Sequence, residues 1–467
     1  MTSSLLKKPH LLRCSVVRLC DAIPIASPRS LLRVLHMRLF QQTAKHFLAI
    51  ILSFGLAVGS QCVVPGRAAA QEELRRVVSL KDLVGEAMQK NPGLKEKKYE
   101  YEAARAKVID AWLPEDPMIG VDVESQPDLF EFNKRMDNEY MIQQTIPFPT
   151  RLFLRGVKAA READIAYQKY KEEERSVIWH IEQPYYELYL ANRTLDALEQ
   201  NQILLDQLLK AVKARYESNQ ATQDDFLKIQ IELSKNTIEV FNWREKIHIQ
   251  EAHFSHELDE SLETQYTLLN EEKRTPFSYP RPELDKIALN KRPELKAFAV
   301  GIESAKANSA LAHTEWLPDI TGRIETRHFR DGDNGDEYDT FIGFTVPVWS
   351  LIKGIGGKWK SSDDELRAAE GMYARMKNEV LLSIHEAYSK VKASENALSV
   401  YENSILPQAK QQVEVALSSY EAGKVDFLNV IDAQRTLKST QIEYYQAVAE
   451  YEMGLSDLRL AVGDDLK

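Results

Sequence analysis

The sequence predicts a mainly α-helical protein with a smaller β part, built from two copies of one α-β-α unit. Three observations predict this class. The WLP motif that contains Trp112 returns at Trp316, 204 residues later. Two short stretches of alternating apolar and polar residues follow each copy of the motif, and a very long helical stretch follows each pair. Landmarks that recur in one order, with small insertions between them, indicate duplication of a single folding unit.

Residues 1–70 have the composition of an export signal rather than of a folded domain. The apolar run Phe47–Val64 follows basic residues and precedes Ala68–Ala70. This order predicts a secretory signal that is cleaved before Gln71, preceded by an extension from a start codon placed too early. A lipoprotein signal ending at Cys62 is the alternative.

The cysteines and the charge bound the chemistry of the mature chain. All three cysteines, Cys14, Cys20 and Cys62, precede Gln71, so a chain beginning there has no thiol for a disulfide or for catalysis. Without residues 1–70 the chain has 51 basic and 69 acidic residues, a net charge of −18. Such a charge repels nucleic acid, so we expect no nucleic-acid partner. It suits cationic cargo, or simply the solubility of long exposed helices.

The first copy, residues 71–275, is predicted to open with two helices. Ser79 begins a capping-box pattern, and the first helix ends before Pro92. The second helix runs from Leu94 to about Ala111. The second copy, residues 276–467, begins at a proline-rich hinge.

Alternation with a period of two predicts strands at about 118–125, 140–146, 320–328 and 338–348. Charged and small residues occupy one face and apolar residues the other. Two ordinary hairpins on a soluble domain would give the same pattern. No apolar run after residue 71 reaches the ~18–20 residues of a membrane helix. If this exported protein spans a membrane, strands closed into a barrel must do so.

A long helix is predicted after each strand pair, from Arg151 to about Ser218 and from about Lys358 to Ala422. Return helices follow, from Thr222 or Gln223 to about Leu262 and from Phe427 to about Ala461. The first helix would extend ~100 Å, too far for a globular domain. Residues that are apolar or aromatic, apart from Gln202, recur in it with the 3-4 spacing of a coiled-coil seam: Leu195, Leu198, Gln202, Leu205, Leu209, Val212 and Tyr216.

Four strands are too few to close a barrel, which needs at least about eight. Three protomers would supply twelve strands and a closed ring of long helices. The sequence therefore predicts a homotrimer, with a trimeric α-helical tunnel and a 12-stranded β-barrel.

The order of these landmarks resembles the TolC family of trimeric outer-membrane efflux channels. The resemblance covers Ser79–Gly463 and rests on NPGL at Asn91, RPEL at Arg292, the two WLP motifs and the segment YEAGKVDFLNVIDAQRTL at Tyr420–Leu437. It implies a barrel in outer-membrane lipid and a helical tunnel in the periplasm. It also implies partners: a periplasmic adaptor (membrane fusion protein) and an inner-membrane pump. The channel would be passive, neither an enzyme nor a cofactor-binding protein.

Two stretches, DPMIGVDVES after Trp112 and QQTIPFPTRLFLRG, look like the branch of the family that serves heavy-metal pumps of the cobalt–zinc–cadmium type. Thr150 stands where that branch usually has glycine. A multidrug or type I secretion channel is the close alternative. A soluble periplasmic coiled-coil adaptor or scaffold is the alternative of another class, although adaptors lack this duplicated order.

The resemblance places a constriction at the periplasmic tips of the helical hairpins. The carboxylates carried over to these tips are Asp224 and Asp225 in the first copy and Asp426 and Asp432 in the second, with Asn429 where some members have aspartate. Threefold repetition would turn each into a ring that favours cations. Asp near a helix start is also a common cap, which is the alternative role.

The turns themselves, with Tyr216 and Tyr420 just before them, are the predicted adaptor-docking surface. A tight turn between helices needs a positive φ, for which Gly423 is the best residue and Asn219 the next best. His248, His253 and His256 lie on one helix, but exposed histidines on polar helices are common, so we predict no metal site.

Overall fold

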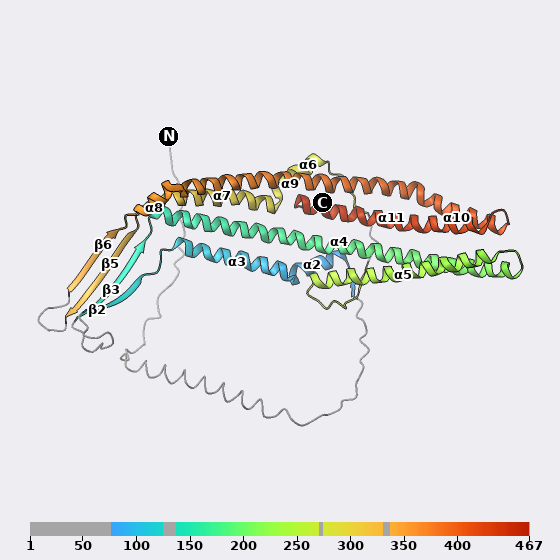
Figure 1. Ribbon diagram of the computed structural model, residues 1–467, viewed down its shortest axis with the longest axis horizontal. Coiled ribbons are helices and arrows are strands. Elements are labelled where there is room, and N and C mark those ends of the chain that lie inside the picture. The colour runs from blue at the N-terminus through green and yellow to red at the C-terminus, as the bar shows by residue number, and fades with distance from the viewer. Residues whose placement is uncertain (1–75, 125–136, 270–273, 330–336, 467) are drawn as a thin grey trace, which may run out of the picture. The chain divides into compact units, whose positions relative to one another are not determined.

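The computed structural model describes residues 76–124, 137–269, 274–329 and 337–466 (Figure 1). The predicted signal and extension, residues 1–70, lie outside the described residues. Within these ranges the chain forms long helices, one four-stranded sheet and one two-stranded sheet. None of the helices in the described ranges combines the length and apolarity required to cross a membrane.

Two helices precede the sheet, as the sequence predicts. Helix α2, Leu80–Lys90, begins after Ser79, whose hydroxyl accepts a hydrogen bond from the Asp82 amide at 3.3 Å. Helix α3, Pro92–Trp112, begins two residues earlier than predicted. The Asn91 side chain caps it by accepting from the Leu94 amide at 2.9 Å. Pro92 suits the first helical position because its fixed φ is helical and its missing N–H is not needed there.

The four-stranded sheet is antiparallel, in the order β2-β3-β5-β6 (Figure 1). Its strands are β2 (Met118–Glu124), β3 (Asp137–Ile146), β5 (Ile320–Phe329) and β6 (Glu337–Phe344). The register brings the apolar positions of all four strands to one face: Ile119, Val121, Tyr140, Ile142, Ile146, Ile320, Ile324, Tyr338, Ile342 and Phe344. All of these except Ile320 are well exposed in the single chain.

Polar residues share the opposite face of the sheet. Arg327 on β5 pairs with Glu139 directly across on β3, and the Thr145 and Thr321 hydroxyls lie 3.1 Å apart. Cross-strand pairs of this kind fix the register. The polar side chains thus pair with one another on one face of the sheet, whereas the apolar side chains on the other face are exposed. An exposed apolar face of this kind needs an apolar environment to cover it.

The fourth strand is shorter than predicted. It ends at Phe344 rather than at Val348, and Val348 instead begins helix α8, Val348–Lys353. The Thr345 amide makes the last bond to the neighbouring segment, donating to the Asp319 carbonyl at 3.0 Å. Pro347 then has no N–H with which to continue the ladder. Val346 and Val348 continue the alternation on either side of Pro347, so the strand predicted from this pattern was too long.

The first long hairpin consists of α4, Pro149–Glu217, and α5, Gln223–Glu257. Helix α4 is continuous over 69 residues despite Pro184 in its interior. Helix α5 ends five residues before the predicted Leu262, because the chain turns at Asp259 with φ +56°. Strand β4, Tyr266–Leu268, then pairs in parallel with β1, Arg76–Val78.

The second long hairpin is divided where the first is continuous. After α6 (Arg281–Lys291) and α7 (Pro293–Thr314), the predicted helix from Lys358 to Ala422 consists of α9 (Trp359–Val400), a π-helical turn and α10 (Leu406–Glu421). The turn, Tyr401–Ile405, directly precedes Pro407 in α10. Proline removes a donor and crowds the preceding turn, which a wider π turn accommodates. Helix α11, Phe427–Val462, returns along α9 and α10.

Among the residues that the structure describes, three apolar clusters hold these helices together. One joins α2, α4 and α5 to the β1–β4 pair, and a second joins α6, α7, α9 and α11. The third joins the ends of the two hairpins, at the end of the helices away from the four-stranded sheet (Figure 1).

Candidate functional site: the paired hairpin tips

The first tip connects α4 to α5 through Asn219, which has φ +60°. The Gln220 amide donates to the Arg215 carbonyl at 2.7 Å and closes the end of α4. Helix α5 then starts with a capping box: the Asp225 amide donates to the Thr222 hydroxyl at 3.2 Å, and the Thr222 amide donates to the Asp225 carboxylate at 3.1 Å. This turn is held by its own polar groups.

The second tip connects α10 to α11 through Gly423, which has φ +68°. The Lys424 amide donates to the Ser419 carbonyl at 2.8 Å, the same five-residue closure as in the first tip. Asp426 occupies the cap position of α11, but its side chain makes no capping hydrogen bond. The predicted positive φ is thus confirmed at both Gly423 and Asn219, while the two tips differ in capping.

An apolar cluster packs the two tips against one another. Tyr420 is 7% exposed and lies against Phe427, with ring centroids 5.6 Å apart. Arg215, from the other hairpin, places its guanidinium 4.5 Å from the centre of the Tyr420 ring and donates to the Tyr420 carbonyl at 3.2 Å. Burial raises the pKa of the Tyr420 hydroxyl above its ordinary value. Tyr216, at the same place in the first tip, is 43% exposed and stacks on Phe226.

The predicted carboxylates have different surroundings. Asp224 pairs with Lys228 at 2.6 Å, and Asp225 is the cap partner of Thr222. Asp432 lies 3.4 Å from Arg435. The structure therefore gives Asp225 the capping role that was the alternative to a lumen role.

Asp426 and Asn429 are exposed, and their side chains have no hydrogen-bond partner in the described part of the chain. Together with Asp224 and Asp432 they form the solvated polar edge of the tips. None of the nine predicted tip residues lies far from the two turns, but the exposed ones share no single pocket.

Sequence reasoning missed the charged contacts between the two hairpins. Glu232 on α5 is 8% exposed and pairs with Arg435 on α11. This hydrogen bond holds the pKa of Glu232 below its ordinary value. Two turns further along α5, the Glu239 carboxylate lies 2.9 Å from the Lys438 amine of α11. The signal that could have found the first pair is Glu232, a charged residue among the buried positions Ile229, Asn236 and Val240 of α5.

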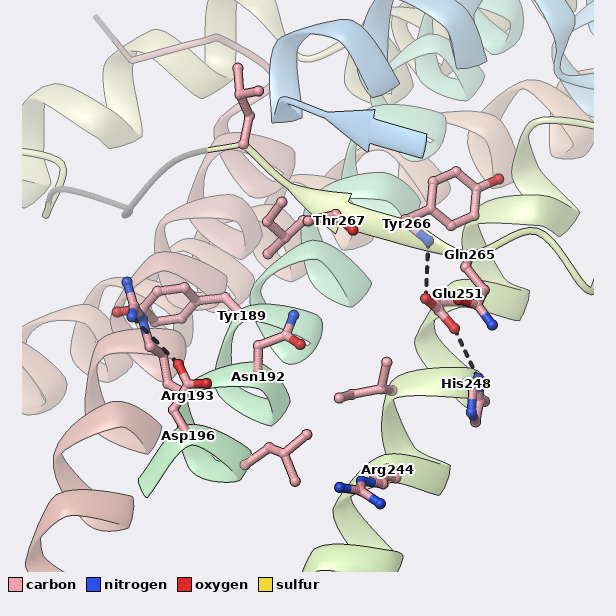
Figure 2. A pocket seen from close by; sticks show the side chains of 14 residues that line it. Tyr189, Asn192, Arg193, Asp196, Arg244, His248, Glu251, Gln265, Tyr266 and Thr267 are labelled. Carbon is pink, nitrogen blue, oxygen red and sulfur yellow. Dashed lines mark hydrogen bonds and ion pairs between the residues drawn. The ribbon is translucent and has the colours of Figure 1, made fainter. Parts of the chain in front are cut away.

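A separate cavity of about 670 Å³ lies beside β4, between α4 and α5 (Figure 2). Glu251 is 5% exposed there and accepts from the Tyr266 amide at 3.0 Å, and its other oxygen lies 3.0 Å from His248 Nδ1. Arg193 on α4 and Arg244 on α5 also line the cavity. Glu251 thus fastens β4 to α5, which is a structural role.

His253 and His256 are exposed on α5 and do not converge with His248. Across the described ranges no three His, Cys, Asp or Glu side chains come together in a group that could hold a metal ion.

A family model, two sequence matches and a solved structure all indicate one family. The model of the family "Outer membrane efflux protein" matches residues 284–464. The cobalt-zinc-cadmium resistance protein CzcC of Cupriavidus metallidurans is 24% identical over 36% of this chain, and the match spans 39% of that relative's length. The outer membrane protein TolC of Vibrio cholerae is 23% identical over 66% of this chain and 71% of its own length.

A solved structure of CusC, described as forming a transmembrane channel, has the same fold. It superposes with a TM-score of 0.71 at 14% identity, covering 84% of this chain and 94% of that one. The sequence matches, the four-stranded sheet and the paired hairpins agree, and the chain belongs to the outer membrane efflux protein family, the TolC-like proteins.

Proposed function

We propose that the protein is the exit duct of an efflux assembly, which passively conducts what an inner-membrane pump and a periplasmic adaptor deliver. As a member of its family it resides in the outer membrane, with its helices in the periplasm. One observation carries the proposal: a sheet with one continuous bare apolar face is joined to two helical hairpins whose tips lie together. The apolar face of the sheet would contact lipid, and the helical hairpins would form the wall of a water-filled tube.

The working form is a homotrimer. Strands β2 and β6 are the edges of the sheet, and paired edges require further copies. Three copies would supply the twelve strands of a closed barrel. Helix α5 supports this assembly, since it exposes an apolar seam at coiled-coil spacing. The seam consists of Leu227, Ile231, Ile238 and Phe241.

The cargo we propose is a heavy-metal cation. The match to a cobalt-zinc-cadmium resistance protein, the acidic mature chain and the exposed tip carboxylates support it. A multidrug or secretion channel is the second candidate, because the match to TolC covers the larger share of the chain.

The tips are the proposed gate and docking surface. Asp224, Asp426 and Asp432, with Asn429, would border the opening, and Asp225 would hold the first turn in shape. The turns at Asn219 and Gly423, with the exposed Tyr216 and the packed Tyr420, would meet the adaptor.

The test is expression in a host that lacks its own channel but has an adaptor and pump. We expect a detergent-stable trimer that resists carbonate extraction, and tolerance to cobalt, zinc or cadmium. Gly423→Val should reduce tolerance while the trimer persists, whereas Gly371→Ala, on an open helix surface, should not. Extraction by carbonate, or absence of the trimer, would contradict the proposed exit duct. Tolerance to organic dyes alone would favour the multidrug candidate.

A further inference from the structure

Helix α8, Val348–Lys353, is short, apolar and bare. It follows the last strand of the sheet and leads through a kinked segment, Gly354–Lys358, into α9 (Figure 1). Trp349 is 76% exposed, and Ile352 and Ile355 are also exposed. Among the described elements, α8 has its main contacts with that kinked segment.

The amphipathic pattern of α8 is the reverse of that of a soluble surface helix. At about 100° per residue, Leu351, Val348, Ile352 and Trp349 occupy a continuous arc of about 160°. Ser350 lies opposite this arc and is half-buried, while the apolar arc is exposed. A helix on a water-soluble body turns its apolar side inward. Something other than water must therefore cover the apolar arc of α8.

The apolar surface of α8 continues that of the sheet. Tyr338, Ile342 and Phe344 lie on the apolar face of β6, and Val346, 81% exposed, joins this face to α8. The surface that faces lipid on the sheet thus runs without interruption onto the helix.

The polar residues around α8 favour lipid over a second copy of the chain. Lys353 ends the helix and Lys360 follows it; both are exposed, and neither has an ion-pair partner in the described residues. Unpaired lysines at the edge of an apolar arc suit phosphate headgroups. Trp349 suits the same zone, because its ring is apolar and its N–H seeks a polar partner.

We propose that α8 is an interfacial helix, lying in the headgroup region of the periplasm-facing leaflet with its apolar arc toward the acyl chains. This inference rests on the proposed outer-membrane location and adds a second mode of membrane contact, beside the sheet. It gives each protomer a lateral anchor at the base of the sheet.

The turn after α8 allows this orientation. Gly357 has φ +142°, a conformation that side-chain-bearing residues rarely adopt, and it separates the direction of α8 from that of α9. Trp359 fixes the start of α9 by donating to the Ala312 carbonyl at 3.1 Å. Its ring covers Gly354, where a Cβ would lie 2.4 Å from the indole.

The equivalent segment of the first hairpin has no such helix. Helix α4 begins at Pro149 without a break, and Arg151 is held by Asp319 at 2.6 Å. Trp112 covers Gly156 and meets the Phe153 ring edge-on. Only the second strand pair is therefore followed by an exposed apolar helix.

Spin labels at neighbouring positions test the proposal. The variants are Trp349→Cys, Ile352→Cys and, on the opposite face, Ser350→Cys, each in a full chain whose own cysteines are replaced by serine. Glu421→Cys, exposed at the second tip, is the aqueous control. The trimer is reconstituted in phospholipid vesicles. Accessibility to oxygen, which concentrates in lipid, is then compared with accessibility to a water-soluble nickel chelate.

We expect oxygen accessibility to exceed nickel accessibility several-fold at positions 349 and 352, the reverse at 421, and low values of both at 350. Nickel access at 349 and 352 would overturn the proposal by showing a surface in water. Protection from both reagents, with broadening between labels, would overturn it in favour of a second copy. On the same samples we measure whether the protein is still a trimer and whether it stays in the vesicles. If both hold, an unfavourable label result contradicts the proposal for α8 alone and not the outer-membrane location.

Discussion

The two hairpin tips share one backbone turn and differ in what holds it. At Asn219 and at Gly423 the chain adopts nearly the same positive φ. The first tip is closed by the Thr222 capping box and leaves Tyr216 exposed. The second tip has an unused cap and buries Tyr420 between the hairpins. The first turn is therefore stabilised locally, whereas the second depends on its neighbour, and a change in hairpin contact should reach the second tip first.

Removal of the buried ring should have the largest effect and should fall on the second tip. Phe427→Ala removes a side chain that is 2% exposed, at a cost of about 3–5 kcal/mol. Phe226→Ala, at the half-buried first-tip position, should cost clearly less. Hydrogen exchange of the tip amides in the trimer measures both. Equal losses would show that the tips are equally dependent on packing.

The turn residues should give the next largest effect. Gly423→Val forces a β-branched residue to φ +68°, at a cost of about 1–2 kcal/mol. Asn219→Gly relaxes the first turn and should change stability by a few tenths of a kcal/mol. The same exchange measurement applies. A Gly423→Val tip as stable as the parent would mean that the turn does not hold this φ.

Removal of a helix cap should destabilise the first tip more than the second, which is the reverse of the order expected for removal of a ring. Thr222→Ala removes a capping hydrogen bond at a cost of about 1 kcal/mol, because the Asp225 amide at the start of α5 loses its acceptor. Asp426→Ala removes no capping hydrogen bond and should leave exchange at the start of α11 nearly unchanged. Equal losses of exchange protection in the two variants would show that the two tips do not differ in capping.

The contact between the hairpins should depend weakly on pH. Arg435 holds the folded-state pKa of Glu232 below its ordinary value of 4.5. The stabilisation is therefore complete above about pH 4.5 and is lost as pH falls through the folded-state pKa. Glu232→Gln should remove this part of the acid dependence in urea-midpoint measurements. Glu239→Gln is the control, since Glu239 is more exposed. An acid dependence identical in the parent and Glu232→Gln would contradict the role of this pair.

The smallest expected effect is on ion preference. Asp426→Asn with Asp432→Asn should lower the cation-to-anion permeability ratio in planar bilayers, more at low salt, because a screened field reaches only ~8–10 Å at physiological salt. Asp225→Asn is the control, since that carboxylate serves as a cap. An unchanged ratio in the double variant leaves the second-tip carboxylates without a part in selectivity.

The sequence predicted the helices and strands well where periodicity and capping are local. Ser79, Pro92 and the strand alternation placed their elements within a few residues. The errors were the overlong last strand, where Pro347 intervenes, and the unbroken second helix, where Pro407 is accommodated by a π turn. In both cases a proline within an otherwise regular pattern changed the local hydrogen bonding.

The candidate site was predicted in position but not in chemistry. The turns at Asn219 and Gly423 follow from residue type, because few residues tolerate a positive φ. The pairs Arg215–Tyr420 and Glu232–Arg435 join residues about 200 positions apart, and no local pattern specifies such partners.

By itself the sequence determined the long helices, the two-faced strands and the positive-φ turns, because each follows from interactions within a few residues. Only the tertiary structure decided which tip is packed and which is exposed, which carboxylate is a cap, and that α8 turns its apolar arc outward. These properties depend on how distant segments meet, since burial and charge pairing are set by neighbours in space rather than in the chain.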